Sequence, residues 1–109
     1  MHTIAVNAVV ADAHPWVLGN LLKAFNAAKE ASVARAREMT ASRFPIPWAP
    51  YFAEQSADMF QGDYWPYGIE DNRVTLDAFL SYAFEQGVCE RRLEVEDLFA
   101  KNVQSSFKV

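Results

Sequence analysis

The order of apolar and polar residues predicts a mainly helical chain with one strand at its start. Residues 1–10 are rich in β-branched side chains and alternate apolar and polar positions from Thr3 to Asn7, a pattern typical of a short strand. A lone strand leaves its backbone N–H and C=O groups without partners. We therefore expect it to pair with a segment outside these 109 residues or with a second copy of the chain.

Helical spacing of apolar residues dominates the rest of the chain. Pro15 suits the first turn of one helix, and Gly87 suits the left-handed position that closes another. The prolines of residues 44–50 separate the first helix from the second, because each proline removes a backbone donor. The expected helices span residues 15–39, 50–60, 70–86 and 95–99. The apolar residues predicted to be buried on the third of them are Leu76, Phe79, Leu80 and Ala83.

Composition and charge narrow the class of protein. With 51% hydrophobic and 22% charged residues, 109 residues are expected to form one segment with a packed core. The net charge of −4 and the absence of a basic cluster argue against a nucleic-acid partner. The sequence also has no signal-peptide pattern and no apolar span of membrane length, which predicts a soluble, cytoplasmic chain without a membrane partner.

Few residues suggest chemistry by their spacing alone. No hydrolase triad, zinc, dinucleotide or phosphate-loop motif is present, and the single Cys89 is expected to be a small, buried or half-buried thiol rather than a nucleophile or metal ligand. His14 precedes a proline and is interpreted as a residue of a helix start. His2 begins the predicted strand, where it either points into a cleft as a general acid or anion ligand or frays with the chain end.

The most unusual segment is Trp65-Pro66-Tyr67-Gly68. Aromatic side chains on a proline-stiffened turn either wall a small-molecule pocket or plug one end of a core. The carboxylates that follow, Glu70 and Asp71, are interpreted as complements of a helix dipole rather than as a catalytic pair. Such aromatic side chains more often plug a core than wall a pocket, so the pattern of this segment favours the core interpretation and leaves the pocket interpretation open.

An ordered series of short segments carries a resemblance to a known family. The series begins with Met1-His2 ahead of the strand, His14-Pro15-Trp16-Val17, and Tyr64-Trp65-Pro66-Tyr67-Gly68 followed by Asn72-Arg73 and Thr75-Leu76. It continues with Glu85-Gln86-Gly87 and Val95-Glu96-Asp97-Leu98-Phe99. Together these segments resemble the C-terminal part of 4,5-dihydroxyphthalate decarboxylase-like proteins, a family similar in fold to type II periplasmic solute-binding proteins. The sequence departs from this family at Asn7-Ala8, where relatives tend to be basic, and at Glu94, where a Thr cap is usual.

The resemblance implies a fold and an origin for the predicted strand. Residues 1–109 would form one C-terminal segment of an α/β two-lobed fold of the periplasmic-binding-protein type, with the N-terminal lobe absent. In that fold the strand after the hinge enters a mixed sheet. Uncovered apolar faces and the strand edge together predict self-association, most simply as a dimer.

The resemblance also implies an activity. The complete protein would be a carboxy-lyase that removes CO₂ from a hydroxylated aromatic dicarboxylate without a metal or an organic cofactor, and this segment alone would be inactive. His2 is the candidate acid, Trp65 and Tyr67 are candidate substrate-binding residues, and the absent lobe would supply the cationic clamp for the small aromatic carboxylate. The alternative is part of a solute-binding protein that captures a small anionic or aromatic ligand without chemistry.

Overall fold

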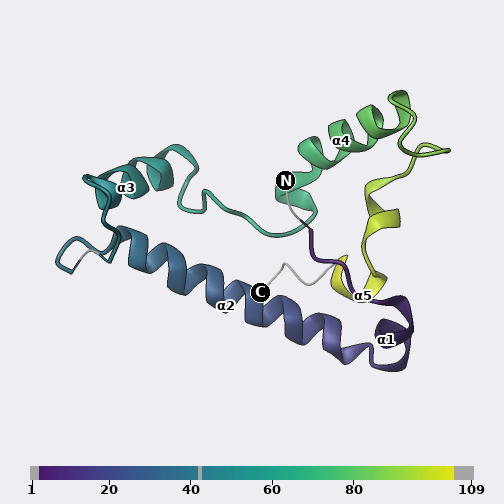
Figure 1. Cartoon of the computed structure of the whole chain (residues 1–109), viewed down its shortest axis with the longest axis horizontal. Coiled ribbons are helices and arrows are strands. Elements are labelled where there is room, and N and C mark those ends of the chain that lie inside the picture. Colours follow the sequence, from purple (N-terminus) through teal and green to yellow (C-terminus); the bar gives the residue numbers. More distant parts are fainter. Residues whose placement is uncertain (1–2, 42, 105–109) are drawn as a thin grey trace. The chain divides into compact units, whose positions relative to one another are not determined.

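The chain is mainly helical, as the sequence predicts. The computed structural model describes residues 3–41 and 43–104, of which 62% are helical. The longer helices (Figure 1) are α1 (Ala8–Ala13), α2 (Trp16–Arg37), α3 (Ala49–Met59) and α4 (Arg73–Glu85). The shorter ones are the 3₁₀ turns η1 (Glu70–Asn72) and η2 (Val95–Leu98) and the helical turn α5 (Lys101–Gln104). Within the described ranges, no helix is both long enough and apolar enough to cross a membrane.

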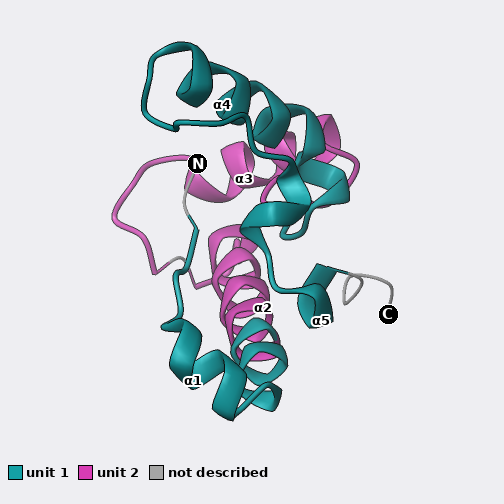
Figure 2. Cartoon of the chain, turned by 90° about the vertical axis from the view of Figure 1, so that its right-hand side faces the viewer, with its two compact units in different colours: residues 1–22, 67–109 teal, residues 23–66 magenta. Residues whose placement is uncertain are grey.

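The helices divide between two compact units (Figure 2). Unit 1 comprises Met1–Leu22 and Tyr67–Val109, and unit 2 comprises Lys23–Pro66. The division falls inside α2, so that the first turns of this helix belong to unit 1 and the remainder to unit 2. Each unit is described by itself below.

The N-terminal strand is not found in the described part of the chain. Residues 3–7 have no regular secondary structure, and α1 begins at Ala8, so the strand prediction is wrong at residues 8–10. Asn7 explains the helix, because its side-chain oxygen accepts the N–H of Val9 at 2.9 Å and so satisfies a donor that a helix start leaves open. Strand preference depends on a neighbouring strand, whereas this cap is entirely local.

The core of unit 1 forms around α4. Its buried residues are Ile69, Leu76, Leu80 and Val95, with Leu93 and Phe99 packed against them. The prediction for Phe79 is wrong, since this side chain is 54% exposed. Leu76 and Leu80 are one helical turn apart on the face that η2 covers, and a 3₁₀ segment of four residues covers only a narrow strip of a helix. Phe79 lies to one side of that strip.

The short helix η2 is fixed at its start by a reciprocal cap. The side chain of Glu94 accepts a backbone N–H of the first turn, and the side chain of Asp97 accepts the N–H of Glu94 at 3.2 Å. A carboxylate, like a Thr hydroxyl, accepts backbone N–H groups at a helix start, so Glu94 serves as a cap here. Val95, the first residue after the cap, is completely buried as a result.

An ion pair of Arg73 with two carboxylates joins η1, α4 and η2. The guanidinium of Arg73 donates to Glu70 at 2.8 Å and to Glu96 at 2.6 Å. The hydrogen bond from Arg73 lowers the pKa of Glu96, and the two carboxylates raise the pKa of Arg73. One side chain at the start of α4 thus holds both η1 and η2.

In unit 2, an ion pair with two parallel hydrogen bonds links the end of α2 to α3. Nε and Nη2 of Arg37 donate to the two carboxylate oxygens of Glu54 at 2.8 and 2.9 Å. Planar guanidinium and carboxylate groups match in this geometry, which fixes their orientation as well as their distance. Proline at position 50 lies in the first turn of α3, in keeping with its missing donor.

Candidate functional site

The three residues proposed for the site are placed differently by the structure. His2 lies outside the described residues. Trp65 belongs to unit 2 and Tyr67 to unit 1, so the structure supplies no distance or shared cavity between these two side chains.

Trp65 stands on a turn that Asp63 organises. One carboxylate oxygen of Asp63 accepts the backbone N–H of Trp65 at 3.0 Å, which is the geometry of an Asx turn. The other oxygen accepts Nζ of Lys29, on α2, at 2.8 Å. The indole of Trp65 is 59% exposed, whereas a side chain that plugs a core is buried. The turn is thus anchored to α2 while its aromatic side chain remains accessible.

The ionisation of Asp63 keeps this anchor in place near neutral pH. Partial burial raises the pKa of the carboxyl group, but the hydrogen bonds from Lys29 and from the N–H of Trp65 outweigh it, so the pKa lies below its ordinary value. Asp63 is therefore charged, and both of its hydrogen bonds are charge-assisted, throughout the neutral range.

We expect Asp63→Ala to loosen the Trp65 turn. Loss of both anchoring bonds should lower the fluorescence anisotropy of Trp65, measured with Trp16 and Trp48 replaced by Phe. In the unsubstituted protein the anchor should weaken only in acid, as the pH falls through the lowered pKa of Asp63. Asp58→Ala, at an exposed carboxylate on α3, is the control and should leave the anisotropy unchanged. Equal anisotropy in all three proteins would contradict the anchoring role.

Tyr67 precedes a tightly held turn in unit 1. The tyrosine is half-buried, and the next residue, Gly68, has φ of 114°, a conformation that side chains other than glycine rarely adopt. The carbonyl of Gly68 accepts Nδ2 of Asn72 at 2.9 Å, which joins the turn to η1. Ile69, only 4% exposed, is the residue of this segment that enters the core. The segment therefore holds Tyr67 at the edge of a packed region.

A shallow hollow lies beside Cys89, the single cysteine of the sequence. It has a volume of about 480 Å³ and is lined by Cys89, Glu90, Arg91 and Leu93. All four residues come from one short stretch of chain after α4, and the hollow opens broadly to solvent. Ligand pockets instead enclose their ligand with groups that converge from several elements. Cys89 is half-buried, which is one of the two degrees of burial that the sequence prediction allowed.

Metal-binding groups do not gather in the described ranges. Among residues 3–41 and 43–104, no three His, Cys, Asp or Glu side chains come close enough to hold a metal ion. Glu70 and Glu96 are both ion-paired with the guanidinium of Arg73.

The sequence reasoning missed Asp63 as a positioning residue. Its signal was present, because an aspartate directly after a glycine in a segment between helices is a common turn residue whose side chain accepts the backbone N–H two residues on. Only the fold places Lys29, 34 positions earlier, on the second carboxylate oxygen.

Comparison with known proteins supplies a relative. All 109 residues match 4,5-dihydroxyphthalate decarboxylase from Comamonas testosteroni at 31% identity. The chain spans about a third of the length of this curated relative, 33%. No protein-family model and no solved structure matches the chain. The family-level similarity to 4,5-dihydroxyphthalate decarboxylase that the sequence motifs predict is therefore confirmed over the whole of this chain.

Proposed function

We propose that this chain forms the C-terminal part of a carboxy-lyase that removes CO₂ from a hydroxylated aromatic dicarboxylate such as 4,5-dihydroxyphthalate. The observation that carries the proposal is the match of every part of the chain to one third of a decarboxylase of that name. The order of the matching segments supports the C-terminal position, and the mainly helical structure is compatible with the helix-rich end of a two-lobed fold.

The reaction makes defined demands on a site. A ring carbon that bears a carboxylate and lies para to a hydroxyl gains a proton, and the ring loses its aromaticity. The bond from that carbon to the carboxylate then breaks, its electron pair returns to the ring, and CO₂ leaves. A site for this step needs an acid near the ring carbon, donors for the developing phenolate and a cation for the remaining carboxylate.

This chain would contribute only part of that site. His2 is the proposed acid, because an imidazole changes its protonation near neutral pH. Trp65 and Tyr67 are proposed to form part of the wall against the aromatic ring. For Trp65, the exposed indole on an anchored turn supports this role. The cationic clamp is assigned to the remaining two thirds of the protein, so the proposed reaction needs both parts.

The test is a chimera in which this chain replaces the matching third of the Comamonas testosteroni enzyme. CO₂ release from 4,5-dihydroxyphthalate is expected from the chimera and from neither part alone, because the acid and the clamp must hold the ring in one reactive pose. The unmatched two thirds of the enzyme, assayed alone, serve as the control. Release by the 109-residue chain alone would contradict the divided site.

The same chimera distinguishes the solute-binding alternative. A folded chimera that binds 4,5-dihydroxyphthalate in calorimetry but releases no CO₂ would favour capture without chemistry. In that case His2→Gln would change ligand affinity and have no turnover to change. CO₂ release at the rate of the parent enzyme would exclude this alternative.

A further inference from the structure

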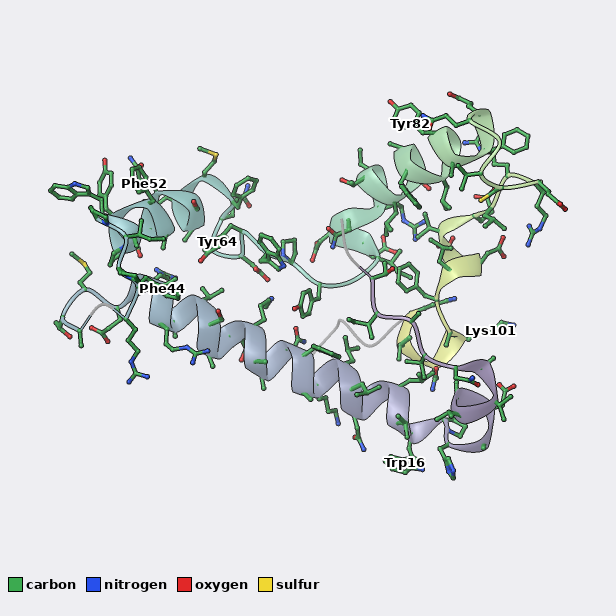
Figure 3. All side chains as sticks on the ribbon, in the orientation of Figure 1. Trp16, Phe44, Phe52, Tyr64, Tyr82 and Lys101 are labelled. Atoms are coloured by element: carbon green, nitrogen blue, oxygen red, sulfur yellow. The ribbon has the colours of Figure 1, made fainter. Side chains whose placement is uncertain are left out.

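Helix α4 carries a second stripe of side chains beside its buried one. The stripe consists of four residues at positions i, i+3, i+4 and i+7, namely Thr75, Ala78, Phe79 and Tyr82. All four are exposed, and the two large rings are 54% and 60% exposed (Tyr82 is labelled in Figure 3). We call these four residues the outer stripe.

The core of unit 1 does not use the outer stripe. The residues of α4 that pack inward are Leu76, Leu80 and Ala83, which face η2 and its buried Val95. Two neighbouring aromatic rings on the outside of a helix form an apolar surface of the kind that marks an interaction site. Spacing over i, i+3, i+4 and i+7 is also the arrangement by which a helix presents anchors to a groove.

The charges at both ends of the outer stripe are negative. Asp71 lies four residues before Thr75, and Glu85 lies three residues after Tyr82, and both carboxylates are exposed. The cation nearest in sequence, Arg73, is held by Glu70 and Glu96. An apolar stripe with an acid at each end complements an apolar surface with lysine or arginine at its border.

This arrangement of charge disfavours a second copy of the chain as the occupant. If two outer stripes paired in antiparallel fashion, Asp71 of one copy would face Glu85 of the other, and parallel pairing would place Asp71 against Asp71. Like charges that face each other across an interface are unfavourable in either case. The net charge of −4 on each copy adds to the repulsion. A second copy of this chain is therefore a poor match for the outer stripe.

We propose that the outer stripe docks on the polypeptide that corresponds to the unmatched two thirds of the decarboxylase relative, on an apolar surface bordered by basic side chains. The proposal rests on the proposed function for the identity of the partner. The match covers only 33% of that relative. In a complete protein of that length, the other two thirds would provide a surface for the outer stripe to contact, which supports the proposal. Phe79 and Tyr82 are the proposed anchors.

The test measures binding in two forms. The 109-residue chain is titrated with the separately produced unmatched part of the Comamonas testosteroni enzyme, and Kd is measured by calorimetry. Phe79→Ser is expected to raise Kd at least 10-fold. The double variant Asp71→Lys, Glu85→Lys is expected to raise Kd further and to reverse the sign of its salt dependence, because attraction between the two surfaces becomes repulsion. In the covalent chimera, Phe79→Ser should lower Tm.

Val74→Ser is the matched control, since Val74 is an 85% exposed apolar residue of α4 outside the outer stripe. It should change neither Kd nor the Tm of the chimera, and Phe79→Ser should leave the Tm of the isolated chain unchanged. An equal loss of Tm in the isolated chain would place the partner of the stripe within these 109 residues and overturn the proposal.

Other results would also overturn it. One such result is the absence of binding between the two parts together with a chimera whose Tm is unchanged by Phe79→Ser. Another is a dimer of this chain that Phe79→Ser dissociates. These binding and stability measurements do not depend on catalysis. Binding between the two parts without CO₂ release from the chimera would contradict the proposed function and support the docking surface. An active chimera whose Tm is unchanged by Phe79→Ser would contradict the docking surface and support the proposed function.

Discussion

Leu80→Ala is expected to lower the free energy of unfolding of unit 1 by about 2–5 kcal/mol. The core around α4 has four buried members, of which Leu80 is 4% exposed, and η2 is too short to move into the space that the lost side chain would leave. A loss of this size is a large share of the total stability of a small domain. Hydrogen exchange of the α4 amides under native conditions measures the effect locally.

The control for this change is Val74→Ala on the same helix. Val74 is 85% exposed, so its truncation leaves no cavity and should change the exchange rates by an amount equivalent to about 0.5 kcal/mol or less. A comparable loss of stability in Leu80→Ala and Val74→Ala would mean that α4 is stabilised by its own helical propensity rather than by its packing against the core.

His2→Gln is expected to lower the turnover of the complete decarboxylase-like protein by about 10²-fold or more. Glutamine preserves the size and polarity of the side chain but has no proton to transfer at neutral pH. The effect should fall on kcat in an assay of CO₂ release from 4,5-dihydroxyphthalate, and the limb of the pH profile that reports the imidazole should disappear with it.

His14→Gln is the matched control for His2→Gln. His14 is exposed between α1 and α2, where its ring contacts Trp16 edge to face with centroids 6.2 Å apart. Its replacement should leave turnover within about twofold, because a helix-start residue does not take part in the proton transfer. Full activity of the His2 variant would remove His2 from the site.

The helices could be predicted from the sequence because their determinants are local. The apolar spacing of residues 15–39 precedes a proline-rich break, and α2 occupies that range from Trp16 to Arg37. The strand could not be judged in the same way. Its β-branched residues express a preference that needs a neighbouring strand, and the cap formed by Asn7 decides for a helix at Ala8.

The burial of individual side chains was harder to predict from the sequence than the positions of the helices. Phe79 fits the helical period as well as Leu76 does, and only the narrowness of η2 decides which of them is covered. At the candidate site, the exposure of Trp65 and the contact of Asp63 with Lys29 depend on a residue 34 positions away, which no local pattern contains. The proposed role of His2 rests on imidazole chemistry and on the family resemblance, since His2 lies outside the described residues.

The fork at Arg73 has a consequence for the order in which unit 1 opens. Its guanidinium holds Glu70 in η1 and Glu96 in η2. Ile69, directly before η1, and Val95, in η2, belong to one buried cluster with the leucines of α4. Fluctuations that release one segment also weaken the grip on the other, so residues 69–73 and 95–98 should exchange their amide protons as a single cooperative unit. At low pH, protonation of Glu96 weakens its ion pair with Arg73. Both segments should then open more readily.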